Sequence, residues 1–224
     1  MDIHKAKPWH GLREFLKEYV VIVVGVLTAL AGEQVTEVFH WRHEAQVQRE
    51  ALLSETRDNM AAATYRNSAA ACVNDRLAEL GEVFRRQAHG QPLGLKRRIG
   101  RPVLWIATTG SWDIAVSGQA LAHMPQPEKL TFSNAFDTYR AWARLKYEEE
   151  QVWSRLALLD QADLLGPGDW PALHQAYAEA VAMNERITRS GSYLLQETSL
   201  GQTPSKPDFS QVQAAWRRFC QPLI

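Results

Sequence analysis

One group of side chains in this sequence has the spacing for metal chemistry. Residues 37–40 form a Glu-x-x-His motif, and His43 and Glu44 follow on the same expected helix. Di-iron helical bundles use this motif twice, but no second copy occurs in the chain. A zinc ion would also need ligands from elsewhere. We therefore expect no metal site and interpret the cluster as a polar belt around Trp41.

The two cysteines, Cys72 and Cys220, lie far apart in the sequence. In an oxidising compartment they could form a disulfide that joins a helix to the C-terminal part of the chain. Such a bridge would stabilise the fold by about 2–4 kcal/mol. Two separate buried thiols are the alternative.

No signature of a known catalytic or nucleotide-binding site is present. Ser117-Gly118 lacks the Gly-x-Ser-x-Gly pattern of a nucleophile elbow, and the chain has no P-loop, Gly-x-Gly-x-x-Gly or His-Glu-x-x-His sequence. We therefore expect a protein that is not an enzyme and that uses no cofactor, with an enzyme of unrecognised site as a further hypothesis.

Charge is balanced over the whole chain but not locally. The 224 residues carry 25 basic and 25 acidic groups, which argues against nucleic acid as the main partner. Six basic side chains nevertheless make a patch: Arg85, Arg86, Lys96, Arg97, Arg98 and Arg101. We interpret the patch as a solvated basic loop, with acidic partners, lipid headgroups or internal pairing to the acidic run 148–150 as alternatives.

The elements that must position these residues begin with an apolar N-terminal segment. Residues 19–32 contain no charge, and the segment extended to Trp41 would span about 33 Å as a helix, with Tyr19 and Trp41 as aromatic ends. Before it, Trp9 and the residues up to Tyr19 have the spacing of an interfacial amphipathic helix. We expect an interfacial segment over 1–18 and a transmembrane anchor over 19–41, with membrane lipid as a partner.

A cleaved signal peptide and a buried soluble helix are alternatives to the anchor. Glu33 and Glu37 lie one turn apart, and an acidic group at membrane depth costs about 2–3 kcal/mol. We place them at the outer headgroup level, or facing a partner helix. Four basic residues precede the segment, at positions 5, 7, 13 and 17, so the positive-inside rule predicts a cytoplasmic N-terminus in the inner membrane and a periplasmic C-terminal domain.

Several short segments resemble a known family: 8–11, 13–18, 23–30, 111–113, 117–118 and 220–223. They look like uncharacterised single-pass proteobacterial membrane proteins. The resemblance implies a location and an architecture, an N-terminal anchor followed by a helical domain, and it brings no catalytic residues.

The rest of the chain predicts an all-α fold, an elongated antiparallel bundle over 42–224. Strong helix formers continue to about Ala88 with a break near Asn67, and residues 90–110 should be non-helical, with a short extended piece at 103–106. Ser111 should cap a short helix. Further helices are expected over 125–165, 170–200 and 208–219, with Asp169 as the cap of the second.

Residues 173–198 have a coiled-coil-like seam with polar or small residues at Asn184 and Gly191. The six Trp residues after position 100 are expected to be anchors of the core. Together these features predict an accessory or scaffold subunit of a membrane or envelope complex that binds other membrane proteins or itself. An extracytoplasmic ligand-sensing domain that works through a membrane partner is the alternative.

Overall fold

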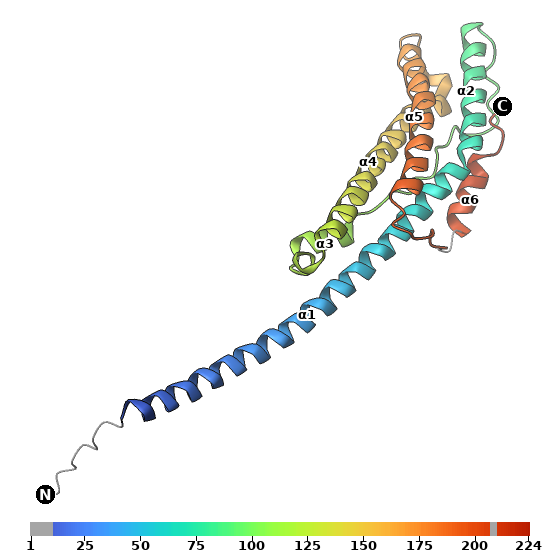
Figure 1. Ribbon diagram of the computed structural model, residues 1–224. Coiled ribbons are helices and arrows are strands. Elements are labelled where there is room, and N and C mark those ends of the chain that lie inside the picture. Colours follow the sequence, from blue (N-terminus) through green and yellow to red (C-terminus); the bar gives the residue numbers. More distant parts are fainter. Residues whose placement is uncertain (1–10, 207–209) are drawn as a thin grey trace, which may run out of the picture. The chain divides into compact units, whose positions relative to one another are not determined.

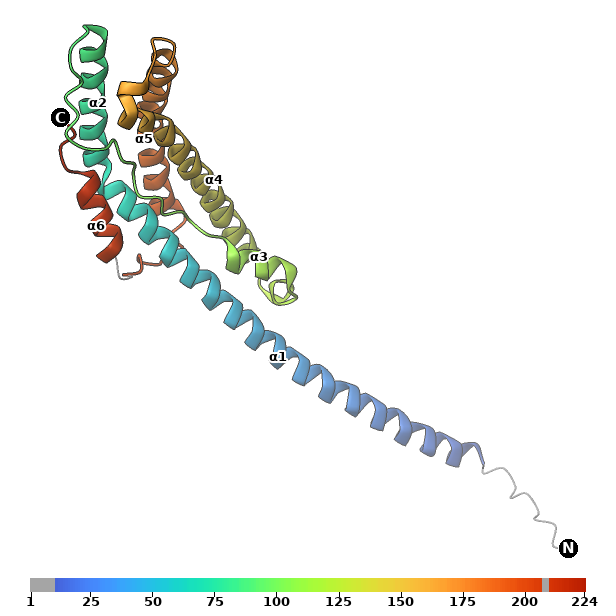
Figure 2. The same cartoon turned by 180° about the vertical axis from the view of Figure 1, so that it is seen from behind.

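The computed structural model describes residues 11–206 and 210–224 and confirms the all-α fold class. Within these ranges the chain forms helices and no strand (Figures 1 and 2). It divides into two compact units, residues 1–47 and 48–224, which are described separately below. Helix α1 (Leu12–Ser68) begins in the first unit and ends in the second.

The described part of the first unit is a single apolar helix. An 18-residue window in α1 has a mean hydropathy of 1.8, and none of that window is buried against the protein. Thr28 and Thr36 donate their hydroxyl groups back to the carbonyls of Val24 and Glu33, at 2.8 and 2.7 Å, so the helix satisfies its own polar groups. By length and composition this segment can cross a membrane.

The expected break near Asn67 is confirmed at the next residues. α1 ends at Ser68, whose hydroxyl donates to the Tyr65 carbonyl at 2.8 Å, and Ala69 leaves the helical conformation with φ −90° and ψ 1°. Helix α2 (Ala70–Ala88) then presents one apolar face to the core, made by Val73, Leu77, Leu80, Val83 and Phe84. Helix α2 ends at Ala88, as expected.

Residues 89–109 contain no helix, as the glycines and prolines predicted. Gly90, Gly94 and Gly100 have positive φ, a conformation that glycine adopts without strain. The expected extended piece at 103–106 forms no strand because it pairs with no neighbouring strand. This segment lies over the bundle, with Ile99 and Ala107 fully or nearly buried.

The predicted cap of helix α3 (Gly110–Ser117) was wrong. Ser111 lies inside α3, and its backbone N–H donates to Glu55 on α1 at 2.8 Å. The Gly110 N–H donates to the other oxygen of the same carboxylate at 2.9 Å. A side chain of α1 therefore satisfies the free N–H groups of α3, an anion placed at a helix N-terminus.

The next long helix differs from the expectation at its C-terminal end. Helix α4 (Gln126–Leu156) begins after Pro125 as expected but ends before Leu165, and the chain continues as the 3₁₀ helix η2 (Ala157–Leu164), with non-helical backbone at Gln161. A shorter 3₁₀ helix, η1 (Ala120–His123), precedes α4. Proline and glycine in a sequence indicate where a helix ends, but they do not indicate where an α-helix changes to a 3₁₀ helix.

Helix α5 (Trp170–Glu197) lies antiparallel to α4 and packs on α2 (Figure 1). Asp169 occupies the N-cap position of α5, as predicted, but its carboxylate accepts a hydrogen bond from the Gly166 N–H at 2.7 Å and makes no capping bond to the helix. Most of the expected seam faces the core: Leu173, Ala180, Asn184, Ile187, Gly191, Leu194 and Thr198 are buried. Helix α6 (Ser210–Phe219) completes the unit.

The core of the second unit is rich in aromatic side chains. Of the six Trp residues expected to anchor it, four are buried and two are half-buried; the four are Trp112, Trp142, Trp153 and Trp216. Trp153 and Trp216 both contact Phe219 edge-to-face, with ring centroids 5.4 and 5.7 Å apart. Helix α6 is thus held on the bundle by its aromatic face.

Candidate functional site

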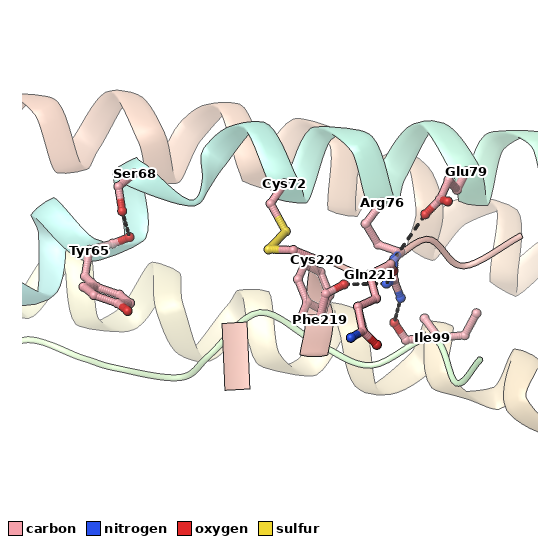
Figure 3. Close-up of a disulfide and its surroundings, with 9 residues drawn as sticks. All are labelled: Tyr65, Ser68, Cys72, Arg76, Glu79, Ile99, Phe219, Cys220 and Gln221. Atoms are coloured by element: carbon pink, nitrogen blue, oxygen red, sulfur yellow. Dashed lines mark hydrogen bonds and ion pairs between the residues drawn. A yellow bond between two sulfur atoms is a disulfide. The ribbon is translucent and has the colours of Figure 1, made fainter. Parts of the chain in front are cut away.

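A disulfide joins Cys72 of α2 to Cys220, the first residue after α6 (Figure 3). The two Cα atoms are 5.3 Å apart, within the normal range for a bridge. Cys72 is half-buried and Cys220 is exposed, so the bond lies at the surface of the unit. It closes a loop of 148 residues and ties the end of the chain to α2.

Next to the disulfide, a buried arginine holds the same two segments together. Arg76 lies one turn after Cys72, and its side chain is 3% exposed. Its guanidinium donates to the Ile99 carbonyl at 2.5 Å, to the Gln221 carbonyl at 2.6 Å and to the Phe219 carbonyl (Figure 3). It also stacks over the Phe219 ring, 4.9 Å from the centroid.

We name Arg76 and the backbone carbonyls to which it donates the arginine clasp. Glu79 lies beside this clasp and pairs with Arg76. The Glu79 carboxylate lies 3.5 Å from the Arg76 Nε atom and accepts a hydrogen bond from the Leu223 N–H at 2.8 Å. Burial lowers the pKa of Arg76, and the Glu79 charge partly offsets that effect. Arginine stays protonated in spite of this, so the clasp carries a permanent charge.

The six basic residues that were expected to form one patch between 85 and 101 fall into two groups in the structure, those with an ion-pair partner and those without one. Arg85 and Arg86 both pair with Glu82, at 2.6 and 2.9 Å, and their hydrogen bonds hold the pKa of Glu82 below its ordinary value. Arg101 pairs with Glu150, as the proposed match to the acidic run suggested. Three of the six residues therefore have an ion-pair partner, although Arg85 and Arg86 share one carboxylate.

The other three, Lys96, Arg97 and Arg98, are exposed, and their side chains make no ion pair in the part of the chain that the structure describes. Two further arginines, Arg217 and Arg218 at the end of α6, are exposed in the same way. Sequence reasoning did not connect them with the loop. The cysteine pair was the available signal, because a bridge from Cys72 to Cys220 brings the end of α6 to α2.

The acidic run also contributes to a buried charge cluster that the sequence did not reveal. Arg66 of α1 donates to Glu149 of α4 at 2.5 Å and to Asn184 of α5 at 2.6 Å, and Lys146 of α4 also bonds Glu149. The side chains of Arg66, Lys146 and Glu149 are only 1–3% exposed. One guanidinium thus links three helices in a water-poor site.

Burial dominates the electrostatics of this cluster. It lowers the pKa of Lys146, against the opposing pull of Glu149. Burial alone would raise the pKa of Glu149, but Lys146 and Arg66 outweigh it and leave that pKa below its ordinary value. The Nη1 atom of Arg66 is buried and has no hydrogen-bond partner among the described residues. Two cations therefore share one carboxylate.

A pocket of about 590 Å³ opens between α4 and α5. Its walls are mainly apolar, with Ala141, Trp142 and Leu145 on α4 and Tyr193 on α5, while Asp137 and Arg189 add one charge of each sign. The volume lies within the range of small-molecule sites. The ion pairs that Asp137 and Arg189 form are on the surface and within their own helices.

In the first unit, two of the predicted interface residues lie on α1, where Tyr19 is exposed and Trp41 is half-buried. Tyr19 stacks on Phe15, and Trp41 donates its indole N–H to Glu37 at 3.3 Å. Glu33 and Glu37 are both exposed. Trp9, the third predicted interface residue, lies outside the described residues.

The Glu-x-x-His motif gains no further ligands in the described ranges, where no group of three His, Cys, Asp or Glu side chains is placed to hold a metal ion. Comparison with protein-family models, with curated proteins and with solved structures finds no match to this chain.

Proposed function

We propose that this protein is a non-enzymatic, single-pass membrane protein whose helical bundle lies outside the cytoplasm and acts as an accessory or scaffold subunit of a membrane or envelope complex. The observation that carries the proposal is the exposed apolar window of α1, with its mean hydropathy of 1.8 and no burial. An apolar surface of this size on a water-soluble chain would aggregate, whereas a bilayer covers it.

The disulfide supports a periplasmic location for the second unit. Reducing conditions in a bacterial cytoplasm keep thiols apart, so a surface bridge between Cys72 and Cys220 suits the periplasm. The four basic residues before the apolar segment favour a cytoplasmic N-terminus. These two observations are independent of each other, and both support the proposal of a periplasmic second unit.

The role as a subunit rests on two features. No catalytic signature accompanies the bundle. Glu33 and Glu37 are exposed on a helix that we place in the membrane or at its border, where a carboxylate favours a polar partner or the headgroups. A membrane-protein partner, or a second copy of the chain, would provide that contact.

Membrane insertion can be tested with two exposure-matched substitutions. Val24 and Val116 are 54% and 57% exposed, but only Val24 lies in the apolar segment. We expect Val24→Lys to remove the protein from carbonate-washed membranes, since a lysine at the centre of a spanning helix costs about 2.5–3.5 kcal/mol. Val116→Lys should leave the membrane fraction unchanged. Equal effects of the two changes would contradict the anchor.

Topology and partnership need separate measurements. An alkaline phosphatase fusion at residue 60 should be active, and a cytoplasmic signal there would contradict the orientation.

Purification from native membranes in mild detergent should bring down a stoichiometric partner. A protein that purifies alone as a monomer would count against the accessory role.

Ligand sensing is a second candidate, favoured by the pocket between α4 and α5. Its 590 Å³ volume and the aromatic wall of Trp142 and Tyr193 suit a small amphipathic molecule. Such a ligand should raise the melting temperature of the intact protein. Ala141→Trp, which would fill the pocket, should abolish that shift.

A further inference from the structure

Two segments that are far apart in the sequence lie side by side at the arginine clasp. The Lys96 backbone N–H donates to the Leu223 carbonyl at 2.9 Å, and Arg76 bonds the carbonyls of residues on both segments. The Phe219 ring would lie only 3.4 Å from a Cβ atom on Gly100. Residues 96–100 and 219–223 are therefore fixed against each other (Figure 3).

This pairing brings two stretches that together carry five exposed basic side chains next to each other. We name these side chains the C-terminal basic surface, which consists of Lys96, Arg97, Arg98, Arg217 and Arg218. None of the five makes an ion pair within the described ranges, in contrast to the neighbouring Arg85, Arg86 and Arg101. The disulfide follows α6 directly and keeps the two arginines of that helix in place.

Two of the nearby carboxylates are engaged in other bonds. Glu79 pairs with Arg76 and accepts the Leu223 N–H, and Asp160 accepts a hydrogen bond from the Ile99 N–H at 2.6 Å. The surface thus keeps its positive potential. A cluster of like charges without internal partners attracts an anionic partner and increases the rate at which the two meet.

A shallow groove beside this surface indicates what kind of anion fits. It measures about 360 Å³ and is lined on the α1–α2 side by Tyr65 and Cys72 and on the α6 side by Gln213, Trp216 and Arg217. Arg217 belongs to both the groove and the basic surface. A concave site with aromatic walls and a basic border suits an extended chain that carries both acidic and apolar side chains.

A lipid surface fits these features less well. Proteins that bind a bilayer from one side combine basic residues with apolar side chains that insert into it. No large hydrophobic side chain is exposed among residues 69–103 or 210–224. The basic surface has charge and a groove but nothing to insert.

We infer that the C-terminal basic surface and its adjoining groove bind an acidic segment of a partner protein. The inference builds on the proposed role as an accessory subunit and specifies the chemistry of the partner. Charge attracts the segment, and the groove between Tyr65 and Trp216 accommodates an apolar side chain from it.

Binding is measured on the full-length protein in non-ionic detergent, with fluorescein-labelled oligoglutamate as the probe. We expect binding in about 0.02 M salt that weakens at about 0.15 M, because salt screens exposed charges. Arg97→Glu with Arg98→Glu should weaken the complex about tenfold, and so should Arg217→Glu with Arg218→Glu.

The matched control is Arg144→Glu with Arg186→Glu. These arginines of α4 and α5 are exposed and make no ion pair in the described structure, like the arginines of the test pairs. The control variant changes the net charge by the same amount as each test variant, but at another place on the protein. The control should change binding less than about twofold. All three double variants should keep the parent's melting temperature, since none breaks a bond seen in the structure.

Three results would overturn the inference. Equal weakening by the control pair would show that only net charge matters. Unchanged binding in both test pairs would show that the probe binds elsewhere. Binding to phosphatidylglycerol vesicles through the same four arginines, without binding to oligoglutamate, would make the partner a lipid. A failed membrane-insertion test would contradict the proposed anchor and would leave these binding results readable on their own.

Discussion

Replacing Glu149 by glutamine should destabilise the second unit more than any surface change. Glu149 is the sole anion of the buried cluster, and its side chain and those of Arg66 and Lys146 are at most 3% exposed. The amide keeps the size and shape of the carboxylate but removes its charge. The variant would therefore leave two cations buried together without an anion.

The size of the effect follows from the cost of an unpaired buried charge. Removing one partner of a buried ion pair costs about 3–5 kcal/mol. In a protein of this size each kcal/mol lowers the melting temperature by about 2–4 °C. Glu149→Gln should thus lower it by about 6–20 °C.

Lys146→Met gives the opposite expectation and serves as the matched test. It removes the excess cation and leaves Arg66 and Glu149 as a neutral buried pair, so stability should change by about 1 kcal/mol or less. The surface control is Glu179→Gln, which breaks a pair with Arg155 whose side chains are 37% and 48% exposed. That loss should be small, because solvent screens an exposed pair.

The cluster also predicts how stability depends on pH. Since the pKa of Glu149 is lowered in the folded state, its contribution is complete above the unfolded value of about 4.3 and is lost as the pH falls through the folded pKa. Burial lowers the pKa of Lys146, so the folded protein loses this proton first, and stability rises as the pH increases from that pKa to about 10.4. Glu149→Gln should flatten the acid limb.

Thermal and urea unfolding, followed by circular dichroism in detergent at several pH values, measure these effects. The reasoning fails if Glu149→Gln and Glu179→Gln cost the same, because burial would then not matter. It also fails if Lys146→Met is as harmful as Glu149→Gln, because the cluster would then need both cations.

The other predictions concern the two ends of the bundle. Cys72→Ala with Cys220→Ala should lower stability by about 2–4 kcal/mol, and a melting temperature unaffected by reductant would contradict the bridge. Arg76→Lys should weaken the clasp and lower the melting temperature, because an ammonium group cannot reproduce the spread of guanidinium donors. Gly191→Ala should destabilise by about 1–3 kcal/mol, since its Cβ atom would lie 2.6 Å from the Asn67 Oδ1 atom, and a more stable variant would refute that packing.

Controls separate these predictions from general damage. Single and double cysteine variants should match, because either change breaks the same bond. Arg85→Lys, at an exposed pair with Glu82, should be nearly neutral beside Arg76→Lys. Gly168→Ala has open space around its Cβ position and should not destabilise by contact.

Local sequence patterns predict the helices and most of their ends. Apolar periodicity, strong helix formers and the positions of proline and glycine are local properties, so the break near Asn67, the end at Ala88 and the non-helical segment could all be read from it. The apolar segment after Tyr19 is local too. The cap of α3 was missed because it comes from Glu55, more than fifty residues earlier on α1.

Which charges form pairs and which remain exposed depends on the tertiary packing. Arg76 and Arg98 both stand in a basic stretch of sequence, yet one is buried against carbonyls and the other is exposed. Glu149 and Glu150 are neighbours, but one pairs with a buried arginine and the other with a surface arginine. Coulomb energy and burial depend on distance in space, and residues remote in sequence set that distance. The C-terminal basic surface exists for the same reason, because packing and a disulfide bring the end of α6 to the loop.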